Sequence, residues 1–258
     1  MEFSLPEFPS APGAQAAFVA AAIAIVLGLI LLIFPGSIGR FLGLQSRATR
    51  PGAIGELRAA GGFLMGLALA TLMFDQPVLY TALGIALAVA AFGRILSLMS
   101  DHPAKFLNFL LLLAQIVLAG ASLYYFFDVF TPGMQFAIPE EGNARLIFYI
   151  YAGTAVIGAI MMFAPRIACR IVGLEGITDT GYTSMRSAGG LAIGAAAVAM
   201  AAPQPMMDFG FGAALAVGAV GRVIALALNR SNYVYAVIAL IVEGGAAAFL
   251  ISSVMGWI

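Results

Sequence analysis

The chain has 258 residues, of which 62% are hydrophobic and 9% are charged, and its formal net charge is +0. A soluble domain carries roughly 25% charged residues, so the composition excludes a soluble globular protein. The balanced charge gives no reason to expect nucleic acid as a partner. The single cysteine, Cys169, excludes an internal disulfide.

Eight apolar segments have about the length that a helix needs to cross a hydrocarbon core of roughly 30 Å. They fall near residues 14–34, 57–74, 78–98, 105–127, 146–163, 185–202, 209–228 and 233–254. Because lipid offers no partner for a free peptide group, each segment must be helical. The sequence therefore predicts an all-α polytopic membrane protein with eight transmembrane helices. The segments that start at Leu57 and Met185 are short, and each could extend backward into its preceding loop.

Basic residues are distributed unequally between the two sides of the predicted bundle. Of the 12 lysine and arginine residues, Arg145 alone falls on the side that also carries the chain termini. The positive-inside rule places the basic loops in the cytoplasm. We therefore expect both termini to be extracytoplasmic.

A short motif occurs twice, as LRAAGG at residues 57–62 and as MRSAGG at residues 185–190. The arginines of the two copies are 128 residues apart (186 − 58). The same offset aligns residues 83–98 with 211–226 without a gap, and nine of these sixteen positions are identical. Polar matches at one fixed offset indicate a duplication rather than chance similarity between apolar segments.

The duplication predicts two parallel four-helix repeats. Because each unit has an even number of spans, both insert the same way round, with a pseudo-twofold axis along the membrane normal. The predicted organisation is an extracytoplasmic N-terminal tail at 1–13, a first repeat at 14–128, an extracytoplasmic linker at 129–142 and a second repeat at 143–258.

One carboxylate lies deep in the second repeat. Glu243 is about eleven residues from the cytoplasmic end of its helix, roughly 16 Å deep. An unpaired ion there would cost about 2.5–3.5 kcal/mol or more. Arg222, roughly 10 Å deep, lies within reach of it. We predict that Glu243 accepts hydrogen bonds from Arg222, with Arg186 as a second or competing donor.

The first repeat has Arg58, Arg94 and Glu56, but it has the neutral Gln115 at the position equivalent to Glu243. Two interpretations stay open. An anionic head group or acidic metabolite could bind at the surplus positive charge. Alternatively, Glu56 pairs with Arg94 while both arginines extend to the interface.

Glycines recur at small-residue spacing after each arginine motif. Gly62 and Gly66 form one such pair, and Gly190 and Gly194 form the other. Small residues four apart let two transmembrane helices approach closely. We therefore predict that these glycines serve helix packing.

Three features together resemble a bacterial four-helix membrane family that is loosely DoxX-like and is catalogued as a domain of unknown function. They are the segment Glu56-Leu57-Arg58 before paired glycines, the Gly-Arg pairs that end at Arg94 and Arg222, and the carboxylate of Glu243. In the second half Ser184 replaces the first glutamate. The resemblance implies a tandem four-helix fold in the bacterial inner (plasma) membrane, and it implies no activity.

The sequence leans toward a non-enzymatic role. We expect no catalytic residue, no metal site and no cofactor. The first hypothesis is a protein that binds or passes a small anion or amphiphile near the cytoplasmic face. Its candidate ligand-binding residues are Arg58, Arg94, Gln115, Arg186, Arg222 and Glu243, with Glu56 as a secondary member. The alternative is an accessory or assembly subunit whose ion pairs are purely structural. Expected partners are membrane lipids and, in the alternative, another membrane protein or a second copy of the chain.

Overall fold

The computed structural model describes residues 8–49, 51–101, 105–128, 137–140, 142–228 and 233–257. Most of the predicted N-terminal tail and most of the predicted linker lie outside these residues.

Eight described helices are long and apolar enough to cross a membrane. They are α1 (Pro12–Ile33), α3 (Gly55–Phe74), α4 (Pro77–Ser100), α5 (Lys105–Asp128), α6 (Gly142–Phe163), α8 (Asp179–Ala201), α9 (Pro205–Leu228) and α10 (Tyr233–Val254). The protein is therefore an all-α polytopic membrane protein, as the sequence predicts. The two spans that were expected to start at Leu57 and Met185 begin earlier in the chain. α3 begins at Gly55 and α8 begins at Asp179.

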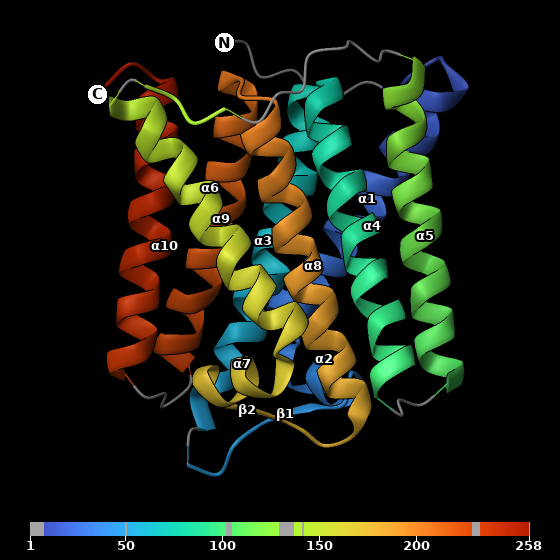
Figure 1. The fold of residues 1–258 in the computed structure, drawn as a ribbon, viewed down its shortest axis with the longest axis vertical. Coiled ribbons are helices and arrows are strands. Elements are labelled where there is room, and N and C mark those ends of the chain that lie inside the picture. The colour runs from blue at the N-terminus through green and yellow to red at the C-terminus, as the bar shows by residue number, and fades with distance from the viewer. Residues whose placement is uncertain are drawn as a thin grey trace.

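Five short elements that hydropathy did not predict gather at one end of the bundle (Figure 1). They are α2 (Pro35–Phe41), β1 (Leu44–Ser46), the 3-10 helix η1 (Pro51–Ile54), α7 (Pro165–Val172) and β2 (Leu174–Gly176). The strands β1 and β2 pair antiparallel and place Gln45 opposite Glu175, whose side chains share a hydrogen bond of 2.7 Å. This pairing joins the two halves of the chain at what we call the β-pair end.

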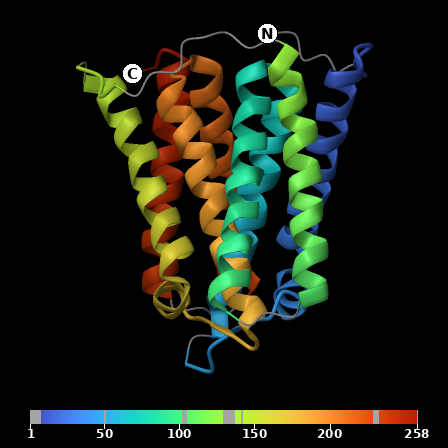
Figure 2. The same cartoon turned by 45° about the vertical axis from the view of Figure 1, so that its right-hand side comes forward.

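The long helices divide into a central set and a peripheral set, and Figure 2 shows them running alongside one another through the molecule. The central helix α3 packs along α9, and α4 packs along α8, so each central contact joins the two halves of the chain. The peripheral helices α1, α5, α6 and α10 pack on the outside of these pairs. Burial follows this division, because 61% of the apolar window of α8 is buried but only 11% of that of α10.

Glycine makes the central contacts possible. A Cβ added at Gly62 or Gly66 would lie within 3 Å of the backbone of α9. A Cβ added at Gly190 or Gly194 would lie equally close to the backbone of α4. Any larger side chain would push the helices apart. The predicted packing role of these glycines is confirmed.

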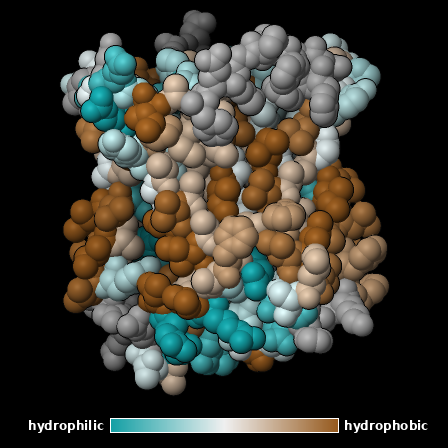
Figure 3. Space-filling view, viewed as in Figure 1, coloured by the Kyte–Doolittle hydropathy of each residue, from teal (hydrophilic) through white to brown (hydrophobic). Residues whose placement is uncertain are grey.

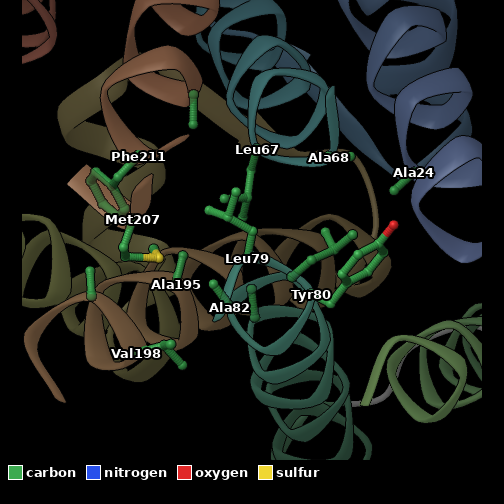
Figure 4. Close-up of a cluster of buried hydrophobic side chains, with 14 of the residues drawn as sticks. Ala24, Leu67, Ala68, Leu79, Tyr80, Ala82, Ala195, Val198, Met207 and Phe211 are labelled. Atoms are coloured by element: carbon green, nitrogen blue, oxygen red, sulfur yellow. The ribbon is translucent and has the colours of Figure 1, made fainter. Parts of the chain in front are cut away.

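All eight long helices contribute buried residues to the main hydrophobic core, and Figure 4 shows part of it. Leu67 of α3, Leu79 of α4 and Phe211 of α9 are fully buried there. Ala24 and Ala195 bring α1 and α8 against the same cluster. The outer surface is also apolar around the middle of the molecule, where brown covers the space-filling view above a more hydrophilic β-pair end (Figure 3). Such a belt fits the hydrocarbon layer of a bilayer.

Candidate functional site

Four arginines lie on the four central helices, and each hydrogen-bonds to the peripheral helix that packs against its own helix. Arg58 on α3 donates from Nη1 to the Leu32 carbonyl oxygen on α1 at 2.7 Å. Arg186 on α8 donates from Nη1 to the Met162 carbonyl oxygen on α6 at 2.8 Å. Both carbonyls lie in the last turn of their helix, where carbonyl groups lack helical partners and carry partial negative charge. These two arginines therefore hold α1 and α6 in place.

Arg222 on α9 connects three helices. Its Nε and Nη2 atoms donate to the two carboxylate oxygens of Glu243 on α10, at 2.7 and 2.8 Å. Its Nη1 atom donates to the carboxylate of Glu56 on α3. The predicted contact between Arg222 and Glu243 is present, with the bidentate geometry that suits a guanidinium. We call these three residues the acidic triad, because they combine two carboxylates with one arginine.

Two predicted contacts are wrong. Arg186 does not donate to Glu243, because its Nε atom pairs with Asp101 at 3.1 Å. Glu56 does not pair with Arg94, because it binds Arg222. Both errors have one cause, which is that α3 and α8 pack against central helices of the other half of the chain. The polar clusters therefore combine contacts inside one repeat with contacts to the other repeat, which Glu56, Ser187 and Asp101 make.

Arg94 on α4 has only neutral partners among the described residues. It is 5% exposed, and its Nε and Nη1 atoms donate to the side-chain oxygens of Gln115 and Asn108 at 2.8 and 3.2 Å. The Gln115 amide in turn donates to the Ser187 hydroxyl on α8 at 2.7 Å. We call these four residues the neutral-amide cluster.

Three members of these polar networks were missed as candidates from the sequence. They are Asn108, Asp101 and Ser187. Of the three, Asn108 could have been noticed in the sequence, because its amide interrupts an otherwise apolar run. The structure shows that it is buried. Asp101 lies in the turn after α4, where a polar residue is ordinary.

The two halves differ in how their peripheral helices meet. α1 packs along α5, whereas α6 and α10 barely touch. The halves also differ in side-chain size at equivalent positions, which are 130 residues apart in these helices. Ala17 and Ala20 of α1 are fully buried, and the corresponding residues of α6 are Ile147 and Ile150. Of the two isoleucines, Ile150 lines the space between α6 and α10.

A groove with a volume of about 440 Å³ lies between α6 and α10. Its lining is almost entirely apolar and consists of Leu146, Tyr149, Ile150, Val242, Gly245, Ala246 and Phe249. Between α10 and α6, at the left of Figure 3, hydrophilic surface is visible deep in the furrow. Glu243 directly follows the lining residue Val242, and 27% of its side chain is exposed. The inner end of the groove therefore lies beside the stretch of α10 that carries Glu243, whose side chain is not among the lining residues.

No family model, no curated protein and no solved structure matches this chain. The resemblance to DoxX-like four-helix proteins stays a prediction. What the site can do must follow from its side chains.

Other candidate chemistry is weak in the described part of the chain. No group of three or more histidine, cysteine, aspartate or glutamate residues there could hold a metal ion. Cys169 on α7 is buried, and burial raises the pKa of its thiol to about 11, against the opposing effect of the Arg47 charge. Because the thiolate is the nucleophile, Cys169 is a poor one at neutral pH.

Proposed function

We propose that the chain is a non-enzymatic membrane protein of the bacterial inner membrane, and that it binds a membrane amphiphile in the groove between α6 and α10. The observation that carries this proposal is the difference between the halves. Two peripheral helices close the first half, whereas the equivalent pair leaves the second half open over an apolar groove next to the acidic triad. An apolar groove with a few polar groups at one end is typical of a ligand site.

The groove and the acidic triad follow one another along the bundle axis. Leu146 and Phe249 lie near the end of the bundle opposite the β-pair end, and Val242 lies near the middle of α10. The acidic triad continues from there toward the β-pair end, since Glu56 opens α3. A ligand whose head group meets the triad would extend its tail through the groove, away from the β-pair end.

We further propose that the β-pair end is cytoplasmic. Basic residues of the short elements gather there, namely Arg40 on α2, Arg47 after β1, and Arg166 and Arg170 on α7. The positive-inside rule supports this orientation. The described chain begins and ends at the other end of the bundle (Figure 1), which would be extracytoplasmic.

We also infer that the fold arose by duplication. Arg58 contacts the Leu32 carbonyl oxygen, and Arg186 contacts the equivalent Met162 carbonyl oxygen. The glycine contacts recur in the same way, since Gly62 packs against Val217 and Gly190 packs against Val89. The two glycines are 128 residues apart, and so are the two valines. These recurrences support the two parallel repeats, and the pseudo-twofold axis stays a prediction.

Filling the groove tests the proposed function. A Cβ at Gly245 would meet nothing within 4 Å, so Gly245→Trp should fold and occupy the groove. Gly120→Trp on α5 is the matched control, because that glycine is equally open and lies on the closed half. After purification in mild detergent, native mass spectrometry should find a bound amphiphile on the wild type and on the control but not on Gly245→Trp. Equal occupancy of all three, or none on any, would contradict the proposal.

The second candidate is an accessory subunit of a larger membrane assembly. It is favoured by the observation that all four arginines are anchored to protein partners. In that case the ion pairs serve only to orient helices. The same purification would then yield a stoichiometric membrane-protein partner and no amphiphile.

A further inference from the structure

We propose that the head group of the bound amphiphile is a cation, of the primary or quaternary ammonium class, which binds beside Glu243. This inference rests on the proposed function and specifies its ligand. It reverses the sign of the ligand expected from the sequence, where the arginines suggested an anion.

The charges of the acidic triad carry the first step. Arg222 is shared by two carboxylates, those of Glu56 and Glu243. With both carboxylates ionised, the triad has one negative charge in excess. Among the described residues, Arg222 is the only cation that forms an ion pair with Glu56 or Glu243. Arg58 lies on the same helix as Glu56, but its guanidinium donates to a carbonyl oxygen of α1. An uncompensated charge at this depth is costly, and an ammonium ion would compensate it.

Exposure indicates where the ammonium would bind. The side chain of Arg222 is 9% exposed, whereas that of Glu243 is 27% exposed. The carboxylate of Glu243 is therefore more accessible to a ligand than the guanidinium of Arg222. An anionic head group would be repelled there.

The groove itself offers a second feature that suits a cation. Tyr149 of α6 and Phe249 of α10 are both lining residues. Aromatic faces attract ammonium groups, and they do so more strongly when water is excluded. The apolar remainder of the groove would hold the hydrocarbon chain.

The first half lacks both features. Gln115 stands at the position of Glu243, and the position equivalent to the groove is closed by the contact of α1 with α5. A single cation site in the second half is therefore expected.

Photolabelling with a matched set of probes tests the head group. The probes share one hexadecyl chain with a diazirine, and they end in a primary amine, a trimethylammonium, a hydroxyl or a carboxylate. The full-length protein is labelled in micelles of an uncharged maltoside detergent, and the labelled peptides are mapped by mass spectrometry. We expect the two ammonium probes to label α6 and α10 at about tenfold lower concentration than the hydroxyl probe, as one charge-assisted contact would give.

Two variants identify the carboxylates as the cause. Glu243→Gln introduces the residue that the first half has at the equivalent position, and it should remove the ammonium preference while labelling by the chain persists. Glu56→Ser introduces the equivalent of Ser184, keeps the pair of Arg222 and Glu243, and should also remove the preference. The second variant decides the question if the first does not fold.

Each outcome has a distinct meaning. Equal labelling by the four probes at α6 and α10, or a preference for the carboxylate, would overturn the cationic head group and leave the groove function standing. Absence of labelling at α6 and α10 with every probe would overturn the proposed function itself. Cross-linking of α6 or α10 to another protein chain in its place would identify a protein as the occupant and overturn both.

Discussion

The two halves of the chain place equivalent arginines, Arg94 and Arg222, in different surroundings. Arg94 is held by the neutral oxygens of Gln115 and Asn108, whereas Arg222 is held by the carboxylates of Glu243 and Glu56. Both arginines are almost fully buried, and both tie a peripheral helix to a central one. The neutral-amide cluster thus has one positive charge, and the acidic triad has one negative charge when both of its carboxylates are ionised.

The comparison teaches that packing and charge diverged separately. The glycine contacts between central helices recur in both halves, so the helix arrangement depends on features that the halves share. The carboxylates do not recur, because Ser184 stands where Glu56 would repeat and Gln115 where Glu243 would. Both acids therefore meet at Arg222. Arg94 and Arg58 form no ion pair among the described residues.

The largest expected effect is the loss of the arginine from the acidic triad. Arg222→Leu leaves two carboxylates facing each other and should destabilise the fold by about 3–5 kcal/mol. Arg94→Leu leaves only neutral amides unpaired and should cost about 1–3 kcal/mol. Unfolding titrations with dodecyl sulfate, followed by circular dichroism, measure both.

The control for this pair of variants removes the stranded charges as well. Adding Glu243→Leu and Glu56→Ser to Arg222→Leu should recover much of the lost stability, because no buried carboxylate remains. Equal costs at Arg94 and Arg222 would show that the two clusters do not differ in charge.

An intermediate effect is expected where the peripheral helices meet. Ala20 is buried in the closed half, and Ala20→Ile would introduce there the residue that α6 has at the equivalent position. The overpacked contact should cost about 1–3 kcal/mol. Replacing a fully buried isoleucine by alanine destabilises a fold by roughly 2 kcal/mol or more. Ile150→Ala in the open half should destabilise it by less than that. The same unfolding titrations decide, and the reverse order would contradict the assignment of closed and open halves.

The smallest effect is a gain. Gln115→Glu gives Arg94 the carboxylate that Arg222 already has, and the Ser187 hydroxyl can donate to it. A charge-assisted hydrogen bond in place of a neutral one should stabilise the fold by about 1 kcal/mol. Gln115→Leu is the comparison and should be destabilising. If Gln115→Glu is the less stable of the two, Arg94 does not carry an uncompensated charge.

Hydropathy and spacing were sufficient for much of the architecture. The eight spans follow from segment length, and the pair of Arg222 and Glu243 follows from the need to neutralise a deep carboxylate. The packing role of Gly62 and Gly190 follows from their spacing within the motif.

The remaining contacts depend on which helices are neighbours, and no periodicity encodes that choice. The pairs of Glu56 with Arg222 and of Arg186 with Asp101 each cross from one half to the other. The antiparallel pair of β1 and β2 has three residues in each strand, too few for a recognisable pattern. Ile150 lines the groove, and this could not be predicted without knowing that α6 faces α10.

The central claim is that the first half is closed and the second half is open toward the bilayer. It is tested most directly by two distances between spin labels in a lipid bilayer, on a Cys169→Ser background. One pair of labels replaces Ile23 and Ile116, which are exposed on α1 and α5. The other replaces Gly153 and Gly244, the equivalent open positions on α6 and α10. The distance in the second pair should exceed that in the first, and equal distances would contradict the open groove.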